Sequence, residues 1–286
     1  MLRGLETAAA GMIAQQHRHD TVTNNISNIN TPGFKQTHAL ARSFPEMLLA
    51  ITGVSAEQGG KVGRLNTGVF AEESLALQLQ GDLMQTNRST DFAIVSDIQV
   101  PGVTFDLSGK AVQPNGDVVY QPSAYFTLQN AAGEIRYTRS GQFSVDADRY
   151  LIASDGTRVL GQDGRPQQLP AGVAANQLLL NSDRQLTLED GTVVGSLLIT
   201  KVNNPHHLVR EGDGKFRLMG NQNEAVPLGA GDRVEVRQGY IERSNVDPAK
   251  SMVELMSALR AYEANQKVVQ FYDRSLDKAV NEVGRV

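Results

Sequence analysis

Histidines are the first residues to examine for chemistry, because they could bind a metal ion. His206 and His207 are adjacent, so on a strand their side chains point to opposite faces. His17 and His19 are two residues apart, and on a helix they do not share a face. The chain has no cysteine, which removes thiolate metal sites and disulfides. The spacing therefore predicts exposed histidines, no metal and no cofactor.

Aspartates could carry acid–base catalysis, but most candidates here stand directly before a glycine. Pairs of this kind are typical of tight turns, where the carboxylate caps the turn more often than it moves a proton. The turn pairs are Asn115-Gly116, Asp155-Gly156, Asp163-Gly164, Asp190-Gly191 and Asp213-Gly214. A wall-active hydrolase would need two carboxylates facing each other, and no spacing singles out such a pair. We expect the protein not to be an enzyme.

The composition excludes several classes of partner. Charged residues make up 20% of the 286 residues, the net charge is −4 and no basic cluster stands out, so we expect no nucleic-acid partner. No stretch reaches the ~18 apolar residues that span a bilayer. The short apolar run at residues 8–14 has no small-residue cleavage site after it, so we interpret it as helix, not as a signal peptide. We expect no membrane span and no small-molecule substrate.

The C-terminal part of the chain predicts one long helix over residues 247–283. Asp247 is a good N-cap and Pro248 suits the first turn. Its apolar seam consists of Met252, Leu255, Leu259, Tyr262, Gln266, Val269, Asp273, Leu276, Val280 and Val283. Polar Gln266 and Asp273 could set the register, or the helix could bend or face a lumen there, and the pattern does not separate these explanations. A helix of this length, on the order of 55 Å, needs a partner helix to cover its seam.

A second helix is predicted over residues 2–29. The alanines at 8–10 favour helix strongly, and Thr31-Pro32-Gly33 ends it. Alone in water such a helix would be marginal, so we expect both helices to be completed by assembly. The predicted assembly seam consists of Leu2, Leu5, Met12, Ile26, Met252, Leu255, Leu259, Tyr262, Val269, Leu276 and Val280.

The middle of the chain has the pattern of an all-β region, with short alternating runs between the turn pairs. The predicted fold is mainly β, with antiparallel sheets or a small barrel, flanked by N- and C-terminal α-helices that form a coiled-coil layer on assembly. The predicted organisation is an N-terminal helix at 1–30, a linker or mobile connection at 31–66, a β-rich core at 67–240 with an insertion at about 96–124, and a C-terminal heptad helix at 241–286.

Three separated segments carry recognisable motifs. The first is N-N-I-S-N-I-N-T-P-G-F-K at 24–35. The second combines 81–94, which includes T-D-F-A-I, with Y-T-R-S-G-Q-F at 137–143. The third combines Q-G-Y-I-E-R-S-N-V-D at 238–247 with R-A-Y-E-A-N at 260–265. In this order and spacing they resemble the bacterial flagellar rod and hook family, and most closely its distal-rod type.

The resemblance implies a structural subunit of the bacterial flagellar basal-body rod or hook-basal body. Such subunits are exported by the flagellar type III apparatus without a cleaved signal peptide and polymerise into an axial tube, with the helices inside and the β region outside. The implied partners are further copies of this chain, other rod and hook subunits, and the type III export gate. The alternative is a monomeric cell-surface β-domain adhesin or wall-binding module, whose two helices pair within one chain.

One stretch departs from the family pattern. The family follows its D-x-A-I segment directly with a G-x-G-F-F strand, whereas here residues 96–124 intervene before Tyr125 and Phe126. This difference predicts an additional hairpin.

Four asparagines lie near the end of the first helix, where asparagine is an unfavourable residue. They are Asn24, Asn25, Asn28 and Asn30. They could reflect fraying before Pro32 or form polar contacts between subunits, and the resemblance favours the second explanation.

The pair Phe44 and Leu48 has the F-x-x-x-L spacing that resembles the gate-recognition motif of rod and hook export substrates. The alternative is that this apolar segment packs against the β region or a neighbouring subunit. Its position after the N-terminal helix supports the export interpretation.

Overall fold

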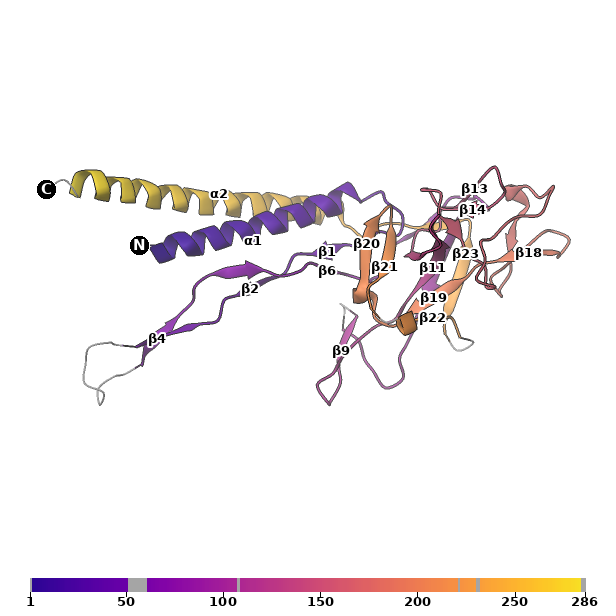
Figure 1. Cartoon of the computed structure of the whole chain (residues 1–286), viewed down its shortest axis with the longest axis horizontal. Helices are drawn as coiled ribbons and strands as arrows, with labels where there is room; N and C mark the ends of the chain where they lie inside the picture. Colours follow the sequence, from indigo (N-terminus) through magenta and orange to yellow (C-terminus); the bar gives the residue numbers. More distant parts are fainter. Residues whose placement is uncertain (1, 51–60, 107–108, 221, 230–231, 284–286) are drawn as a thin grey trace. The chain divides into compact units, whose positions relative to one another are not determined.

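The computed structural model describes residues 2–50, 61–106, 109–220, 222–229 and 232–283 (Figure 1). The chain forms two compact units. The helical unit comprises Met1–Ser27, Thr37–Leu75 and Asp247–Val286, and the β unit comprises Asn28–Gln36 and Ala76–Val246.

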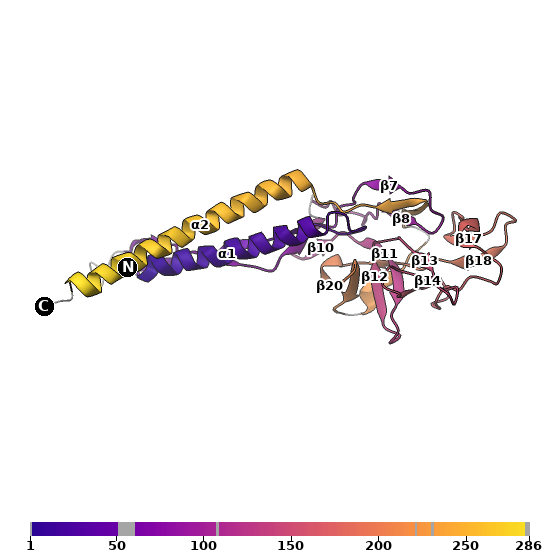
Figure 2. The same ribbon diagram turned by 90° about the horizontal axis from the view of Figure 1, so that it is seen from above.

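The helical unit is built on α1 (Leu2–Ser27) and α2 (Pro248–Lys278), and a single π-helical segment (Ala279–Val283) follows α2. The two helices lie side by side (Figure 2) and contact each other. As predicted, Asp247 caps α2, because its carboxylate accepts hydrogen bonds from the amides of Ala249 and Lys250 at 2.9 and 3.1 Å. No helix in the described parts of the chain is both long and apolar enough to cross a membrane.

The first helix ends at Ser27, two residues before the predicted end. The next residues form a turn, in which Thr31 donates to Asn28 twice. Its amide reaches the Asn28 carbonyl and its hydroxyl reaches Asn28 Oδ1, both at 3.1 Å. Asparagine and threonine side chains compete in this way with helical hydrogen bonds, which explains the earlier end.

Among the described residues of the segment predicted as a connection at 31–66, short strands form part of a β arm. After β1 (Thr37–His38), β2 (Ala41–Ser43) pairs antiparallel with β5 (Val69–Ala71), and β3 (Met47–Ala50) pairs antiparallel with β4 (Lys61–Leu65). Within the helical unit α1 contacts both β1 and β5, and Figure 1 shows the arm in purple near α1. The hydroxyl of Thr21 on α1 lies 3.1 Å from that of Ser74, which follows the arm.

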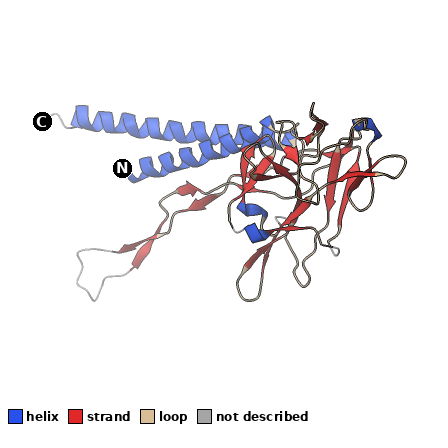
Figure 3. Cartoon of the chain, turned by 45° about the vertical axis from the view of Figure 1, so that its right-hand side comes forward, coloured by secondary structure: helices blue, strands red, loops and turns tan. Residues whose placement is uncertain are grey.

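The β unit contains antiparallel sheets joined by tight turns, with short 3-10 turns as its helical elements (Figure 3). Its largest sheet has the order β13-β14-β15-β11-β12-β21-β20, and β19 pairs with both β11 and β22. These strands are β11 (Ser123–Gln129), β12 (Ile135–Thr138), β13 (Ser144–Val145), β14 (Leu151–Ile152), β15 (Arg158–Val159), β19 (Ile199–Val202), β20 (Leu208–Gly212), β21 (Lys215–Leu218) and β22 (Ala225–Pro227).

Smaller sheets complete the β unit. One has the order β16 (Leu179–Leu180), β17 (Gln185–Thr187) and β18 (Val193–Ser196), and β23 (Val234–Gln238) pairs with β8 (Phe92–Ser96). Strand β24 (Tyr240–Glu242) pairs with β7 (Leu83–Gln85). The short strand β6 (Leu75–Ala76) spans the point where the chain passes from the helical unit to the β unit. The 3-10 turns are η1 (Ala175–Gln177), η2 (Pro205–His207) and η3 (Gln222–Glu224). The predicted fold class, antiparallel sheets flanked by terminal helices, is confirmed.

The main core of the β unit forms where aromatic residues of different strands meet. Phe92, Phe126 and Phe143 are buried, and the rings of Phe126 and Phe143 lie edge to face with centroids 5.2 Å apart. Phe92 lies on β8, Phe126 lies on β11 and Phe143 directly precedes β13, so this core joins three separate segments of the β unit.

The Asp-Gly pairs form tight turns, as predicted. Gly156, Gly164 and Gly191 all have positive φ, between 73° and 85°. The preceding aspartates cap their turns: Asp155 accepts from the Thr157 hydroxyl at 2.7 Å, and Asp190 accepts from the Thr192 amide at 2.9 Å. This last bond helps to lower the pKa of Asp190 below its usual range. These carboxylates therefore stabilise tight turns by accepting hydrogen bonds from nearby residues.

A short hairpin lies within the stretch 96–124. Strands β9 (Lys110–Val112) and β10 (Val118–Tyr120) pair antiparallel around the turn at Gly116. The ring of Tyr120 lies 4.3 Å from that of His206, which attaches the end of the hairpin to η2.

Candidate assembly site

Three charged residues meet in the interior of the β unit, and each comes from a different motif. Lys35 follows the turn at Gly33, Arg139 follows β12, and Glu242 ends β24. Lys35 Nζ donates to Glu242 Oε1 at 2.5 Å, and Arg139 Nε donates to Glu242 Oε2 at 2.5 Å. The side chain of Glu242 is 0% exposed and those of Lys35 and Arg139 are each 3% exposed. We call these three residues the junction triad.

Backbone groups complete the hydrogen bonding of the junction triad. Lys35 Nζ also donates to the carbonyl of Leu79 at 2.7 Å, and the amide of Gly81 donates to Glu242 Oε1 at 2.9 Å. Arg139 donates through Nη1 to the carbonyl of Ala124 at 2.6 Å and through Nη2 to that of Ile94 at 3.1 Å. The triad therefore connects distant passages of the chain.

The electrostatics of the triad are unbalanced, because two cations share one anion. Burial lowers the pKa of Lys35 to about 8, which the attraction of Glu242 only partly offsets. Burial alone would raise the pKa of Glu242, but Arg139 and Lys35 outweigh it and hold that pKa below its usual range. Both carboxylate oxygens are hydrogen-bonded and enclosed, so Glu242 serves to hold segments together.

The turn that delivers Lys35 to the triad depends on glycine. Gly33 has φ of +70°, and a Cβ there would lie 2.6 Å from the amide nitrogen of Ser140. Its amide donates to the Glu242 carbonyl at 2.8 Å. Phe34, the next residue, lies under the guanidinium of Arg210, 4.4 Å from the ring centroid.

Asn245 connects three passages of the same region. Its Oδ1 accepts from the amide of Gln36 at 2.6 Å, and its Nδ2 donates to the carbonyls of Leu77 and Leu79 at 3.2 and 3.1 Å. The segments around residues 35, 79 and 245 are therefore fixed against one another by a charged triad and a side-chain amide.

The helical unit presents two different faces of α2. Positions that are buried or half-buried alternate at spacings of four and three residues: Ser251, Leu255, Ala258, Tyr262, Asn265, Val269, Tyr272, Leu276 and Ala279. We call this the inner face. Four members of the predicted seam belong to it: Leu255, Tyr262, Val269 and Leu276.

The other seam positions lie one residue further along and are exposed: Met252, Leu259, Gln266 and Asp273 on α2, and Val280 in the π-helical segment that follows it. Their exposure accounts for the two polar residues in the seam. Val253, Met256, Val268 and Phe271 are exposed as well, with Phe271 at 74%. We call the apolar members Met252, Val253, Met256, Leu259, Val268, Phe271 and Val280 the outer face.

On α1 the seam residues Leu5, Met12 and Ile26 are half-buried. The side chain of Leu2 lies outside the described residues, as does that of Val283 at the other end of the predicted seam. The most enclosed apolar side chains of α1 are Ala8, Ala14 and Val22.

The four asparagines take different positions. Asn25 is 1% exposed; its Oδ1 accepts from the amide and hydroxyl of Thr37 at 3.0 and 3.1 Å, and its Nδ2 donates to the Thr37 carbonyl at 2.7 Å. This differs from the inter-subunit contact expected from the sequence, since the amide is engaged within one chain. Asn28 accepts from Thr31, and Asn24 and Asn30 are exposed.

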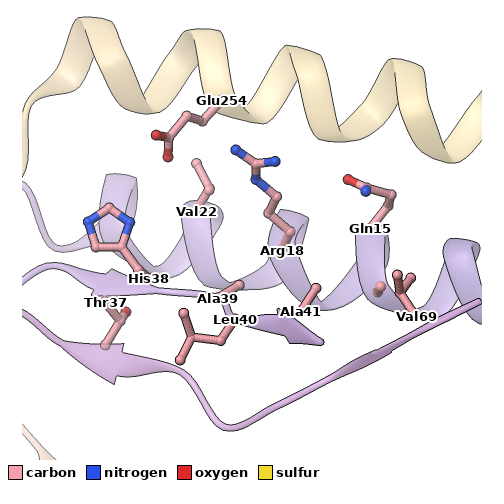
Figure 4. A pocket seen from close by; sticks show the side chains of 11 residues that line it. Gln15, Arg18, Val22, Thr37, His38, Ala39, Leu40, Ala41, Val69 and Glu254 are labelled. Carbon is pink, nitrogen blue, oxygen red and sulfur yellow. The ribbon is translucent and has the colours of Figure 1, made fainter. Parts of the chain in front are cut away.

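A polar hollow of about 220 Å³ lies within the helical unit (Figure 4). Arg18 of α1 and Glu254 of α2 enter it from the two helices, and His38 of β1 enters from the arm. Its charges are mixed, and the described residues contain no group of three or more histidine, aspartate or glutamate side chains suited to a metal ion. The hollow therefore offers no defined ligand chemistry.

The junction triad lies within the quoted motifs, but sequence spacing gave no sign that its members meet. The available signal was one charged residue inside each otherwise apolar or small-residue stretch: G-F-K, Y-T-R-S-G and Y-I-E. Charged residues in such stretches are rarely buried unless they are paired, so their partners could have been sought among the other motifs.

Three family descriptions match separate parts of the chain. "Flagella basal body rod protein" matches residues 5–35, "Flagellar hook protein FlgE/F/G D1 domain" matches 121–209, and "Flagellar basal body rod FlgEFG protein C-terminal" matches 237–282. Each match contains one member of the junction triad.

Similarity to individual proteins extends over the whole chain. It is 33% identical to the flagellar hook-basal body complex protein FlhO of Bacillus subtilis, over 100% of both chains. It is 30% identical to the flagellar basal-body rod protein FlgG of Borreliella burgdorferi over 98% of each chain, and 28% identical to FlgG of Bacillus subtilis over 98% of this chain and 99% of that relative. The chain therefore belongs to the flagellar basal-body rod and hook protein family, and it is a structural protein, not an enzyme.

Proposed function

We propose that this chain is a FlgG-like structural subunit of the flagellar basal-body rod, which assembles with further copies and with other rod subunits. The observation that supports this most directly is the outer face of α2. Phe271 is 74% exposed and Val253 is 69% exposed on a helix whose other side already packs within the chain. Large apolar side chains left exposed along one helix in this way are typical of protein–protein contacts.

The geometry suits a repeating assembly. A contact between the outer face of one copy and a different surface of the next is heterologous, and such contacts generate rings or open filaments. In this proposal residues 1–30 and 241–286 form the inner coiled-coil layer, and residues 67–240 form the outer β layer. Leu255, Tyr262, Val269 and Leu276 support the helix pair, whereas Met252, Leu259 and Val280 contact the neighbouring subunit.

Asn24 and Asn30 are the asparagines best placed for polar contacts between subunits, because both are exposed. Asn25 and Asn28 instead hold the end of α1 to the residues that follow it. The alternative of a monomeric adhesin does not account for the whole-length similarity to rod proteins.

We further propose that Phe44 and Leu48 are read by the flagellar type III export gate before the chain folds. Phe44 is 38% exposed, and its ring centroid lies 5.3 Å from that of Phe70. Leu48 lies on β3, but its side chain is outside the described residues. If Phe44 stabilises the folded chain, it would therefore do so through its ring contact with Phe70.

That relationship provides a matched control for the export proposal. In a flagellated host, Phe44→Ala should accumulate in the cell and be lost from the secreted fraction, whereas Phe70→Ala should be secreted. If both variants are secreted normally, or if both are lost equally, Phe44 is not an export signal.

The rod assignment itself is tested by complementation in a host that lacks its FlgG-like subunit. The chain should restore motility and be present in purified basal bodies. A chain that is stably produced and secreted but absent from basal bodies would contradict the assignment.

A further inference from the structure

Two glycines of α1 lie directly against larger side chains of α2. A Cβ built on Gly4 would lie 2.6 Å from Cζ of Tyr272, and one built on Gly11 would lie 3.0 Å from Nδ2 of Asn265. Neighbouring atoms essentially never approach a real Cβ more closely than 3.0 Å. At Gly4 the obstacle is the phenolic end of the Tyr272 side chain, so a larger residue there requires either this ring or the helix to move.

The two contacts repeat with the same period in opposite directions. Seven residues separate Gly4 from Gly11 along α1, and seven separate Tyr272 from Asn265 along α2. The helices therefore run antiparallel, and the contacts recur once per heptad. A further two heptads lead to Asn25 on α1 and Ser251 on α2, which are each 1% exposed.

We infer that Gly4 and Gly11 determine which face of α2 turns toward α1, and in which register. The inner face has small residues at alternate core positions, and its larger members Tyr272 and Asn265 fit where α1 has no side chain. The methionines and Phe271 of the outer face are exposed and lie at helical positions that these two contacts leave turned away from α1. The glycines thus keep the outer face turned away from α1.

Helix propensity makes this role unusual and testable. Glycine costs about 1 kcal/mol relative to alanine in a helix interior, where Gly11 lies, so glycine-to-alanine changes there normally stabilise a helix. Here Gly4→Ala should instead lower the melting temperature of the helices by several degrees, measured by circular dichroism at 222 nm on the full-length chain. Gly11→Ala should have a smaller effect, because the Asn265 amide can rotate.

A compensating substitution separates the specific contact from general damage. Tyr272→Leu in the Gly4→Ala chain should restore the melting temperature, because it removes the ring that the new Cβ meets. Phe271→Leu is the matched control: it changes the adjacent but exposed aromatic residue and should not restore it. Stabilisation by Gly4→Ala, or equal rescue by both leucine variants, would overturn the inference.

Disulfide formation tests the register directly, because the natural chain has no cysteine. The double variant Gly11→Cys with Asn265→Cys should form a disulfide within one chain on mild oxidation. The shifted pair Gly11→Cys with Tyr272→Cys should not, since those positions lie a heptad apart. Equal cross-linking of both pairs, cross-linking between chains, or none from the first pair would refute it. Neither experiment depends on rod assembly, so this inference can fail while the proposed function stands.

Discussion

Lys35 Nζ and Glu242 Oε1 lie 2.5 Å apart and join residues that are 207 positions apart in the chain. This contact places the end of the N-terminal motif against the C-terminal motif inside the β unit. Arg139 brings the middle motif to the same carboxylate. The family's three motif regions therefore meet at the junction triad. Substitutions of its three residues should lower the free energy of unfolding by different amounts.

Glu242→Gln should be the most damaging change in the triad. It leaves Lys35 and Arg139 buried together without an anion, and removing one partner of a buried pair typically costs about 3–5 kcal/mol. Urea unfolding of the full-length chain, followed by circular dichroism, measures this free energy. Glu235→Gln is the control, because Glu235 pairs with Arg237 at an exposed position, where water and salt screen the pair and its loss should change the unfolding free energy far less. Equal losses for the two variants would contradict this account.

Lys35→Met should be the mildest change in the triad, because it removes the excess cation and leaves Arg139 paired with Glu242. The pKa of Lys35 is about 8 in the folded chain, below its usual 10.5. Between these values the unfolded chain binds more protons, so this lysine makes stability rise with pH. The unfolding free energy of the parent chain should therefore rise relative to that of Lys35→Met from pH 8 to 10.5. Parallel curves would show that the lysine keeps its ordinary pKa.

On the acid side the prediction concerns Glu242. Its pKa is lowered in the folded chain from the usual 4.5, so its contribution is complete above that value and is lost as the pH falls through the folded pKa. The parent chain should lose unfolding free energy below pH 4.5 more steeply than Glu242→Gln. An identical acid slope for both chains would exclude Glu242 as a major titrating group.

Asn25→Ala should loosen the start of the arm. It removes acceptors for the amide and hydroxyl of Thr37 and a donor to its carbonyl, and unsatisfied buried groups of this kind cost about 1–3 kcal/mol. Amide hydrogen exchange should show lost protection at Thr37. Asn24→Ala, at the exposed neighbouring position, should leave that protection unchanged. Unchanged protection in both variants would mean that these hydrogen bonds contribute little.

Some elements were predictable from the sequence because their causes are local. Asp247 caps α2 through its own carboxylate, and Asp155 and Asp190 shape the turns that they begin. In each case the residue that supplies the signal also makes the contact.

The inner face of α2 was only half predictable. Leu255 and Tyr262 were recognisable as seam residues, but Ser251, Ala258 and Asn265 were not, since small or polar residues give no apolar signal. The larger Met252 and Leu259 directly follow Ser251 and Ala258 in the sequence and fit the heptad pattern. Both side chains are nevertheless exposed. Ser251, Ala258 and Asn265 lie on the inner face because α1 approaches α2 closely. This close approach is visible only in the folded pair of helices.

The central claim, that the outer face of α2 builds the rod, is tested by Phe271→Asp in a host lacking its own subunit. Because Phe271 is 74% exposed, the purified variant should keep the far-ultraviolet spectrum and melting temperature of the parent chain. It should be secreted but absent from purified basal bodies, and motility should be lost. Gln270→Asp, an adjacent exposed position with no apolar side chain to lose, is the control and should assemble. Incorporation of Phe271→Asp at the level of the parent chain would contradict the account.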